Sequence, residues 1–147
     1  MRMLGTAAGL GFAMTLIAAA ANAQNIVDMK GTWIGQAEAI VDGPAQHHPA
    51  PGAAGTAPAG KYRLSEPTFT LVIEGQSGRR FWGTTSSATH TERLLGSLSF
   101  DGKRIHMVDD DGYNDGVMID ADTFESCYRH ITATSAVVAC AIAKRKK

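Results

Sequence analysis

Eight short segments with β-strand character follow one another along the chain, and turn sequences rich in Gly, Asp and Asn separate most of them. No segment after residue 23 shows a helical period. Because closing a sheet removes its exposed edges, this order favours an all-β fold, an eight-stranded antiparallel up-and-down (meander) barrel. A flattened β-sandwich is the alternative. The predicted strands cover residues 29–41, 68–74, 79–87, 91–100, 103–108, 113–119, 123–131 and 135–146.

The first residues predict export from the cytoplasm. One arginine precedes an uncharged apolar run from Leu4 to Ala21, and Ala21-Asn22-Ala23 offers small residues at the positions that a signal peptidase reads. Glycines dilute the apolar run and no basic stop-transfer cluster follows it, which argues against a retained anchor. We therefore expect a cleaved signal peptide (1–23), a single β-barrel domain (24–147) in the periplasm or secreted, and membrane contact only before cleavage.

The charges of the chain balance. Fourteen Lys and Arg residues oppose fourteen Asp and Glu residues, so the formal net charge is zero. A neutral domain has no electrostatic reason to bind nucleic acid, and no nucleic-acid partner is expected.

Two cysteines predict a covalent link in the last hairpin. Cys127 and Cys140 fall directly opposite one another if the hairpin turns at Ala133-Thr134. Directly opposed Cβ atoms in antiparallel strands lie close to disulfide distance. We expect a disulfide in an oxidising compartment, and two reduced, buried cysteines are the alternative.

The two ends of the domain resemble those of calycins, the barrel family that includes lipocalins and avidins. The resemblance rests on Gly31-x-Trp33 in the first strand and Lys144-Arg145-Lys146 at the end of the last. It implies that Trp33 closes one end of the barrel with a basic residue across its indole ring. A cation over an indole contributes about 0.5–2 kcal/mol. The barrel-closing residues are then Gly31, Trp33 and Arg145, and no biotin-contacting pattern is present.

Two further stretches, residues 107–113 and 127–130, resemble short exported proteins of alphaproteobacteria. This resemblance implies a location in the cell envelope and no activity.

The last hairpin suggests a binding site inside the barrel. Strand alternation places Tyr128 and His130 on one face, opposite the small residues Ala139 and Ala141. That face either leaves room for a ligand or belongs to a filled core. The residues predicted to contact a small apolar or aromatic ligand are Trp33, Trp82, Tyr128 and His130.

An acidic segment is the candidate metal site. Residues 109–116 are dense in carboxylates, and Asp109, Asp111 and Asp115 could supply oxygen ligands to Ca²⁺. The EF-hand pattern fails because Tyr113 occupies a ligand position and no closing glutamate follows. An acidic, solvated hairpin loop is the alternative, and no other cofactor is expected.

Residues 42–60 form a Gly/Pro/Ala/His-rich stretch that predicts a flexible loop between the first two strands. His47 and His48 lie in it, but no third ligand accompanies them, so we expect solvent-exposed histidines without a metal.

The sequence shows no nucleophile elbow, zinc-binding helix or phosphate-binding glycine loop, and it predicts no enzyme. The predicted function is an exported non-catalytic β-barrel that binds a small molecule in the cell envelope. The alternative is an envelope protein-interaction or structural module with a solid barrel core. The expected partners are accordingly a small apolar ligand or an envelope protein.

Overall fold

The computed structural model describes residues 26–43 and 62–147. These residues contain no helix, and therefore none that is long and apolar enough to cross a membrane. The predicted signal peptide, His47, His48 and most of the 42–60 loop lie outside the described residues. The strands are β1 (Gly31–Asp42), β2 (Arg63–Ser65), β3 (Thr68–Ser77), β4 (Arg80–Ser86), β5 (Thr91–Leu98), β6 (Arg104–Val108), β7 (Tyr113–Asp120), β8 (Thr123–Ile131) and β9 (Ala136–Arg145).

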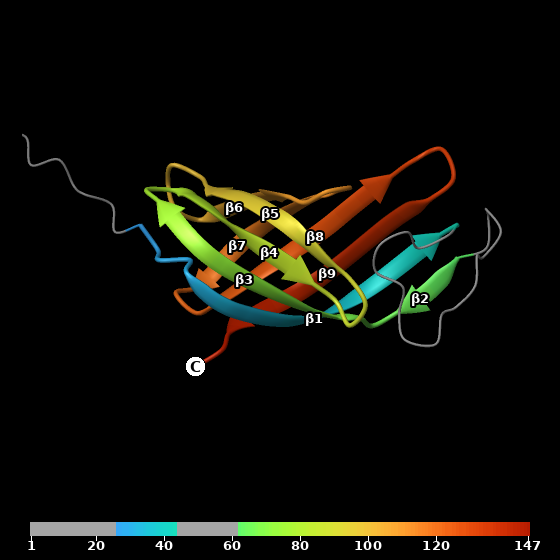
Figure 1. Ribbon diagram of the computed structural model, residues 1–147, viewed down its shortest axis with the longest axis horizontal. Helices are drawn as coiled ribbons and strands as arrows, with labels where there is room; N and C mark the ends of the chain where they lie inside the picture. Colours follow the sequence, from blue (N-terminus) through green and yellow to red (C-terminus); the bar gives the residue numbers. More distant parts are fainter. Residues whose placement is uncertain (1–25, 44–61) are drawn as a thin grey trace, which may run out of the picture.

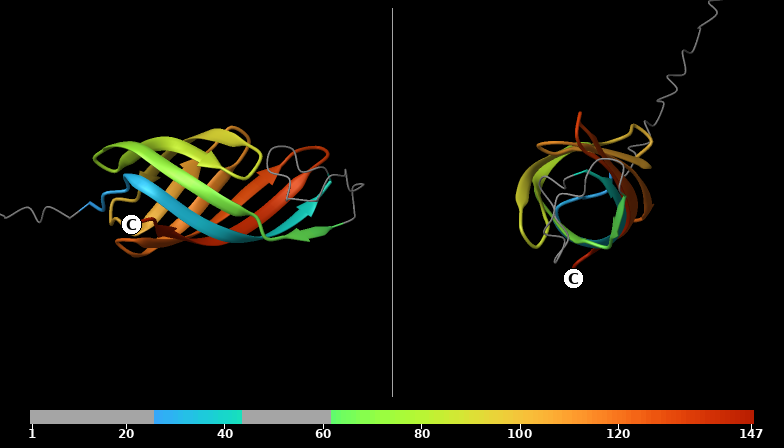
Figure 2. Two further views of the ribbon diagram at one scale, coloured as in Figure 1. Left: turned by 60° about the horizontal axis from the view of Figure 1, so that its bottom comes forward. Right: turned by 90° about the vertical axis from the view of Figure 1, so that its right-hand side faces the viewer.

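The strands form one closed antiparallel barrel. From β3 onward each strand pairs with the next, and β1 pairs with β9 over ten residues to close the sheet. The view along the barrel in Figure 2 shows the resulting ring. The prediction of an eight-stranded up-and-down barrel is confirmed, and the β-sandwich alternative is wrong.

The ninth strand, β2, is the outer part of the second barrel strand. β2 and β3 pair with β1 in one continuous register, and the amide of Ala37 donates to the carbonyl of Pro67 (2.9 Å) between them. Pro67 has no N–H to give to the ladder, so the strand is interrupted there without leaving the barrel.

The barrel strands are strongly staggered. Directly paired residues followed once around the barrel from Leu64 on β2 lead to Gly75 on β3, eleven residues further along the same barrel strand. Such a stagger tilts the strands and gives eight of them an interior that can hold side chains or one small ligand.

Seven of the predicted strands agree with the structure to within two residues at each end, whereas β3 is longer than expected. Gly75 and Gln76 lie beyond the end of the predicted strand but continue β3, and the register shifts between Ile73 and Gly75. Gln76 accepts the amide of Met29 (2.6 Å) and donates to the carbonyl of Val27 (2.9 Å). The strand therefore extends because it also anchors the segment before β1.

One end of the barrel is filled by large side chains. Trp33 is fully buried, its ring centroid lies 5.0 Å from that of Phe124, and its Nε1 donates to the carbonyl of Met29 (2.9 Å). Residues 26–30 and the C-terminus lie at this same end (Figure 1). We call it the closed end. Its other buried residues include Ile73, Phe81, Leu98 and Ile105.

Arg145 joins the parts of the closed end. Its guanidinium lies 4.1 Å from the centre of the Trp33 ring, the arrangement that the calycin resemblance implied. Gly31 lies directly beside it, because a Cβ added there would touch the guanidinium. The same guanidinium donates hydrogen bonds to the segment before β1 and to the β7–β8 turn, at Asp28 O, Lys30 O, Ala121 O and Asp122 Oδ1.

The predicted disulfide is confirmed. Cys127 on β8 and Cys140 on β9 are direct cross-strand partners with their Cα atoms 4.0 Å apart, and they are bonded through their sulfurs. Both side chains belong to the outer face of the barrel, because Tyr128 and Ala139 beside them face inward.

The double substitution Cys127→Ser and Cys140→Ser should lower the free energy of unfolding by about 3 kcal/mol, the value for constraining a short loop in the unfolded chain. Urea denaturation of the variant and of the oxidised wild type measures this difference. Reducing the wild type should bring its midpoint to that of the variant. Equal midpoints for the oxidised wild type and the variant would contradict a stabilising disulfide.

Arg145→Lys should lower the free energy of unfolding by about 2–3 kcal/mol, because lysine keeps the charge over Trp33 but cannot form the planar fork of hydrogen bonds. Lys144→Arg, at the neighbouring exposed position, is the matched control and should leave the denaturation midpoint unchanged. Equal midpoints for both variants and the wild type would refute this role of Arg145.

Candidate functional site

The other end of the barrel, which we call the open end, is hollow. A cavity of about 90 Å³ lies between the sheet walls, larger than the volume that a single water molecule needs. Small residues of β1 and β9 leave this space, namely Gly35, Ala37, Ala39, Ala139, Ala141 and Ala143.

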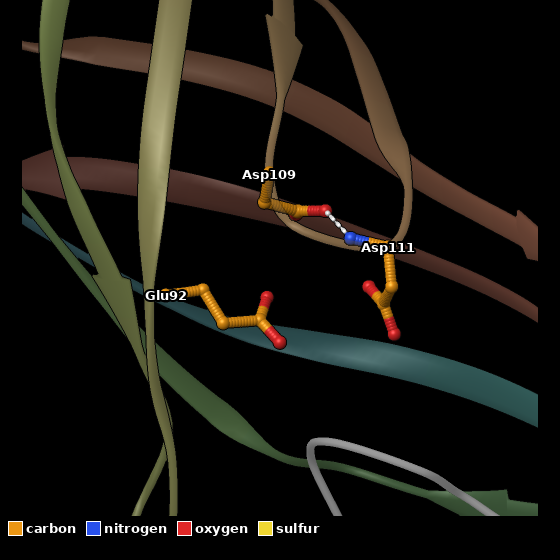
Figure 3. Close-up of side chains that lie close together, drawn as sticks. All are labelled: Glu92, Asp109 and Asp111. Carbon is orange, nitrogen blue, oxygen red and sulfur yellow. Dashed lines mark hydrogen bonds between the residues drawn. The ribbon is translucent and has the colours of Figure 1, made fainter.

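Three carboxylates gather at the open end. Glu92 extends inward from β5 towards Asp109 and Asp111 in the β6–β7 loop (Figure 3), and each contributes an oxygen within 4.8 Å of the others. Glu92 is only 2% exposed, and the two aspartates are partly buried. Asp109 and Asp111 also line the cavity.

The β6–β7 loop is held by its own backbone and by Tyr128. Asp109 Oδ1 accepts the amides of Gly112 (2.8 Å) and Asp111 (3.4 Å). The Tyr128 ring lies against Gly112 so closely that a Cβ there would collide with it. This contact brings the Tyr128 hydroxyl to Asp111, where it donates to Oδ1 (2.6 Å).

Burial and the neighbouring charges shift two protonation equilibria. Burial is the main cause that raises the pKa of Asp109 above its ordinary value of 3.8, and the charges of Glu92 and Asp111 raise it further. Hydrogen bonds from the backbone amides of Gly112 and Asp111 lower the pKa but do not cancel this rise. Burial also raises the pKa of the Tyr128 hydroxyl, as do its hydrogen bond to Asp111 and the surrounding negative charges. Tyr128 therefore remains a hydrogen-bond donor at physiological pH.

His130 brings an imidazole into the cavity wall next to Tyr128. Its Nδ1 lies 3.1 Å from the carbonyl oxygen and 3.4 Å from Oδ2 of Asp111, and both of these atoms are acceptors. Nδ1 therefore carries a proton. His130 is 6% exposed, and Nε2 has no hydrogen-bond partner among the described residues.

The structure brings together only two of the four predicted ligand-contacting residues. Tyr128 and His130 line the cavity, whereas Trp33 belongs to the packed closed end. The prediction that Trp82 contacts a ligand inside the barrel is wrong. Trp82 lies on the outer face, where it is 45% exposed and its ring covers Gly75. Phe81 takes the inward position on β4, and strand alternation then turns Trp82 outward.

The predicted metal-binding set also needs correction. Asp115 lies on the outer face of β7, where it contacts His106 (2.8 Å) and Arg129, and it does not join Asp109 and Asp111. Asn114 takes the inward position instead, so alternation separates Asp115 from the cavity.

Glu92 completes the carboxylate group in place of Asp115, and the sequence analysis missed it. Alternation along β5 places Glu92 on the same face as Leu94 and Leu98, which both belong to the core. The signal in the sequence was a charged residue at the same alternation as two core leucines, since charged side chains are rarely buried without a role.

Comparisons with known proteins identify no family for the chain. No family model matches it, and no curated protein does. A solved structure that it resembles is titled "Structure of S-type Phycobiliprotein Lyase CPES from Guillardia theta". The match covers 81% of this chain and 89% of that one, with 12% sequence identity and a TM-score of 0.33. The comparisons give no support for the resemblance to exported alphaproteobacterial proteins.

The match corrects one expectation. The sequence analysis predicted that the chain is not an enzyme, but the protein it matches is titled a lyase, so that exclusion does not hold.

Asp109→Asn should raise the melting temperature at pH 7. The raised pKa means that the folded state disfavours ionised Asp109, so its ionisation destabilises the fold as the pH rises through that pKa. Asparagine keeps the Oδ1 acceptor for the two loop amides without the charge. Thermal melts should show the gain at pH 7 and none below pH 3.8, where Asp109 is protonated in both states. A gain of equal size at both pH values would contradict the electrostatic cause.

Proposed function

We propose that this domain binds a small organic molecule in the cavity at the open end of the barrel. The observation that supports the proposal is the unequal filling of the interior. Large side chains pack the closed end, while small residues of β1 and β9 leave space around Tyr128 and His130. A barrel with a fully packed interior would carry larger apolar side chains at these positions of β1 and β9 as well.

The wall of the cavity has the composition of a ligand site. Alanine methyl groups and the apolar side chains of Phe69 and Leu71 offer contact to an apolar or aromatic body. A few polar groups, among them Tyr128, His130 and Asp111, converge on one side. Binding sites for small molecules combine apolar walls with a small number of placed polar groups in this way.

The proposed place of action is the periplasm or the extracellular space. The disulfide between Cys127 and Cys140 supports this, because such bonds persist in oxidising compartments and are rare in the cytosol. The apolar run and small-residue site before Gln24 support the same location by their pattern.

Ala141→Leu should abolish ligand retention while preserving the fold, because the added isobutyl group occupies the cavity. Native mass spectrometry of protein purified from its own compartment should show an additional small mass on the wild type and none on the variant. Val138→Leu, on the outer face of the same strand, is the matched control and should retain the mass. A wild type that carries no small molecule, or equal retention by Ala141→Leu, would contradict the proposal.

A further inference from the structure

We propose that the outer wall of the barrel formed by β4, β5, β6 and β7 docks an acidic, apolar segment of a partner protein. These four strands lie side by side in the sheet (Figure 1). The surface lies outside the cavity, so the inference goes beyond the proposed function. Three features of the wall carry it: a continuous row of exposed apolar side chains, an excess of arginine around that row, and a groove beside it.

Exposed apolar side chains form one unbroken row across the four strands. We call it the apolar row, and it consists of Trp82, Leu95, Val108 and Tyr113, which are between 45% and 59% exposed. Each is the direct cross-strand partner of the next, from β4 to β7. Directly opposed side chains begin about 5 Å apart, so the four form a single patch. Contiguous apolar surface of this kind marks an interaction site, whereas scattered apolar residues do not.

The two aromatic residues of the apolar row are held in place before any partner binds. The Trp82 ring covers Gly75, its direct partner on β3, so closely that a Cβ there would collide with it. The guanidinium of Arg129 lies 5.1 Å from the centre of the Tyr113 ring. Aromatic side chains that are already fixed lose little conformational entropy on binding, and Trp and Tyr supply much of the binding energy at protein interfaces.

The wall around the apolar row is basic. The outward positions of β4, β5 and β6 include Arg80, Arg93 and Arg104 and no acidic residue. Arg93 pairs with Asp110 of the β6–β7 loop, at 2.6 Å. Within the described residues, 26–43 and 62–147, the guanidinium groups of Arg80 and Arg104 form no hydrogen bond or ion pair. These two groups are therefore available to acidic side chains of a partner.

The acidic residue Asp115 on β7 does not reverse this balance. It already contacts His106, at 2.8 Å, and Arg129 on the neighbouring strands. The exposed wall thus offers more positive than negative charge beside the apolar row. A partner segment that carries Asp or Glu next to apolar residues complements such a surface, and a basic segment is repelled by it.

A groove beside the apolar row favours a protein over a lipid surface. Leu95, Val108 and Tyr113 line it together with His106 and Asp115. A groove accepts a projecting side chain, as the packed centre of a protein interface requires, and a bilayer surface presents none. A second copy of this chain fits less well, because a symmetric contact through the same wall would bring the arginines of both copies together.

A displayed library of random peptides is the probe, because it makes no assumption about the partner's sequence. Selection on the wild type, with counter-selection on Leu95→Ser, should enrich peptides that combine apolar residues with Asp or Glu. Fluorescence anisotropy of the enriched peptides would then give their Kd at low and high salt. Binding should weaken as salt rises, since screening reduces the attraction between exposed charges.

Leu95→Ser should weaken the enriched peptides about tenfold, because it removes the most exposed side chain of the apolar row. Combining Arg80→Gln with Arg104→Gln should weaken them by a similar factor and flatten the salt dependence. The matched controls lie on the outer face of β9. Ile142→Ser removes an apolar side chain that is 50% exposed, Lys144→Gln removes a positive charge, and both should bind like the wild type.

Four results would overturn the inference. Failure to enrich any peptide, or equal binding by wild type and Leu95→Ser, would refute the docking surface. Enriched peptides without Asp or Glu would refute an acidic partner. Binding to vesicles that contain phosphatidylglycerol, if lost in Leu95→Ser, would assign the apolar row to a membrane. A dimer in analytical ultracentrifugation, if lost in the same variant, would assign it to a second copy.

Val108→Ser tests the same row should Leu95→Ser not fold, and it should weaken the peptides in the same way. Ligand retention in the cavity should not change in any of these outer-face variants. The docking surface and the cavity function therefore stand or fall on separate measurements.

Discussion

The contact between Arg145 and Trp33 is the interaction on which the rest of the barrel depends. β1 and β9 come from opposite ends of the described chain, and their pairing alone turns an open sheet into a barrel. Arg145 stabilises this pairing by covering the Trp33 ring and by hydrogen bonding to the segment before β1 and to the β7–β8 turn. Because one side chain satisfies acceptors from separate segments, the closed end is fixed in a single arrangement.

Stability concentrated at the closed end permits a less favourable open end. Trp33, Phe81 and Phe124 bury large apolar areas there, the dominant favourable contribution to folding. At the open end the fold instead tolerates small residues around a cavity and an almost fully buried glutamate beside two aspartates. A cavity and buried carboxylates lower the free energy of unfolding, and such features are common at functional sites. The tight packing of the closed end offsets this loss.

Alternation along strands explains both what the sequence predicts and what it does not. The eight barrel strands and the Cys127–Cys140 pair follow from local patterns, since period two and a centred turn define which residues oppose each other. The site combines residues from separate strands, so its composition depends on stagger and on the phase of each strand. Trp82 and Asp115 belong to the outward phase, and Glu92 belongs to the inward one. Residue type alone suggested Trp82 and Asp115 as site residues, whereas only the alternation along β5 places Glu92 in the site.

The proposed site is coupled to the stability of the barrel through the residues that form it. β5, the β6–β7 loop and β8 supply its groups, and the Tyr128–Asp111 hydrogen bond ties the loop to the sheet before any ligand binds. Little ordering is then needed on binding, which favours affinity. A ligand that binds only the folded barrel stabilises it by mass action. Occupancy should therefore slow local opening of the β6–β7 loop before it affects the closed end, where Arg145 and Trp33 hold the fold independently of the cavity.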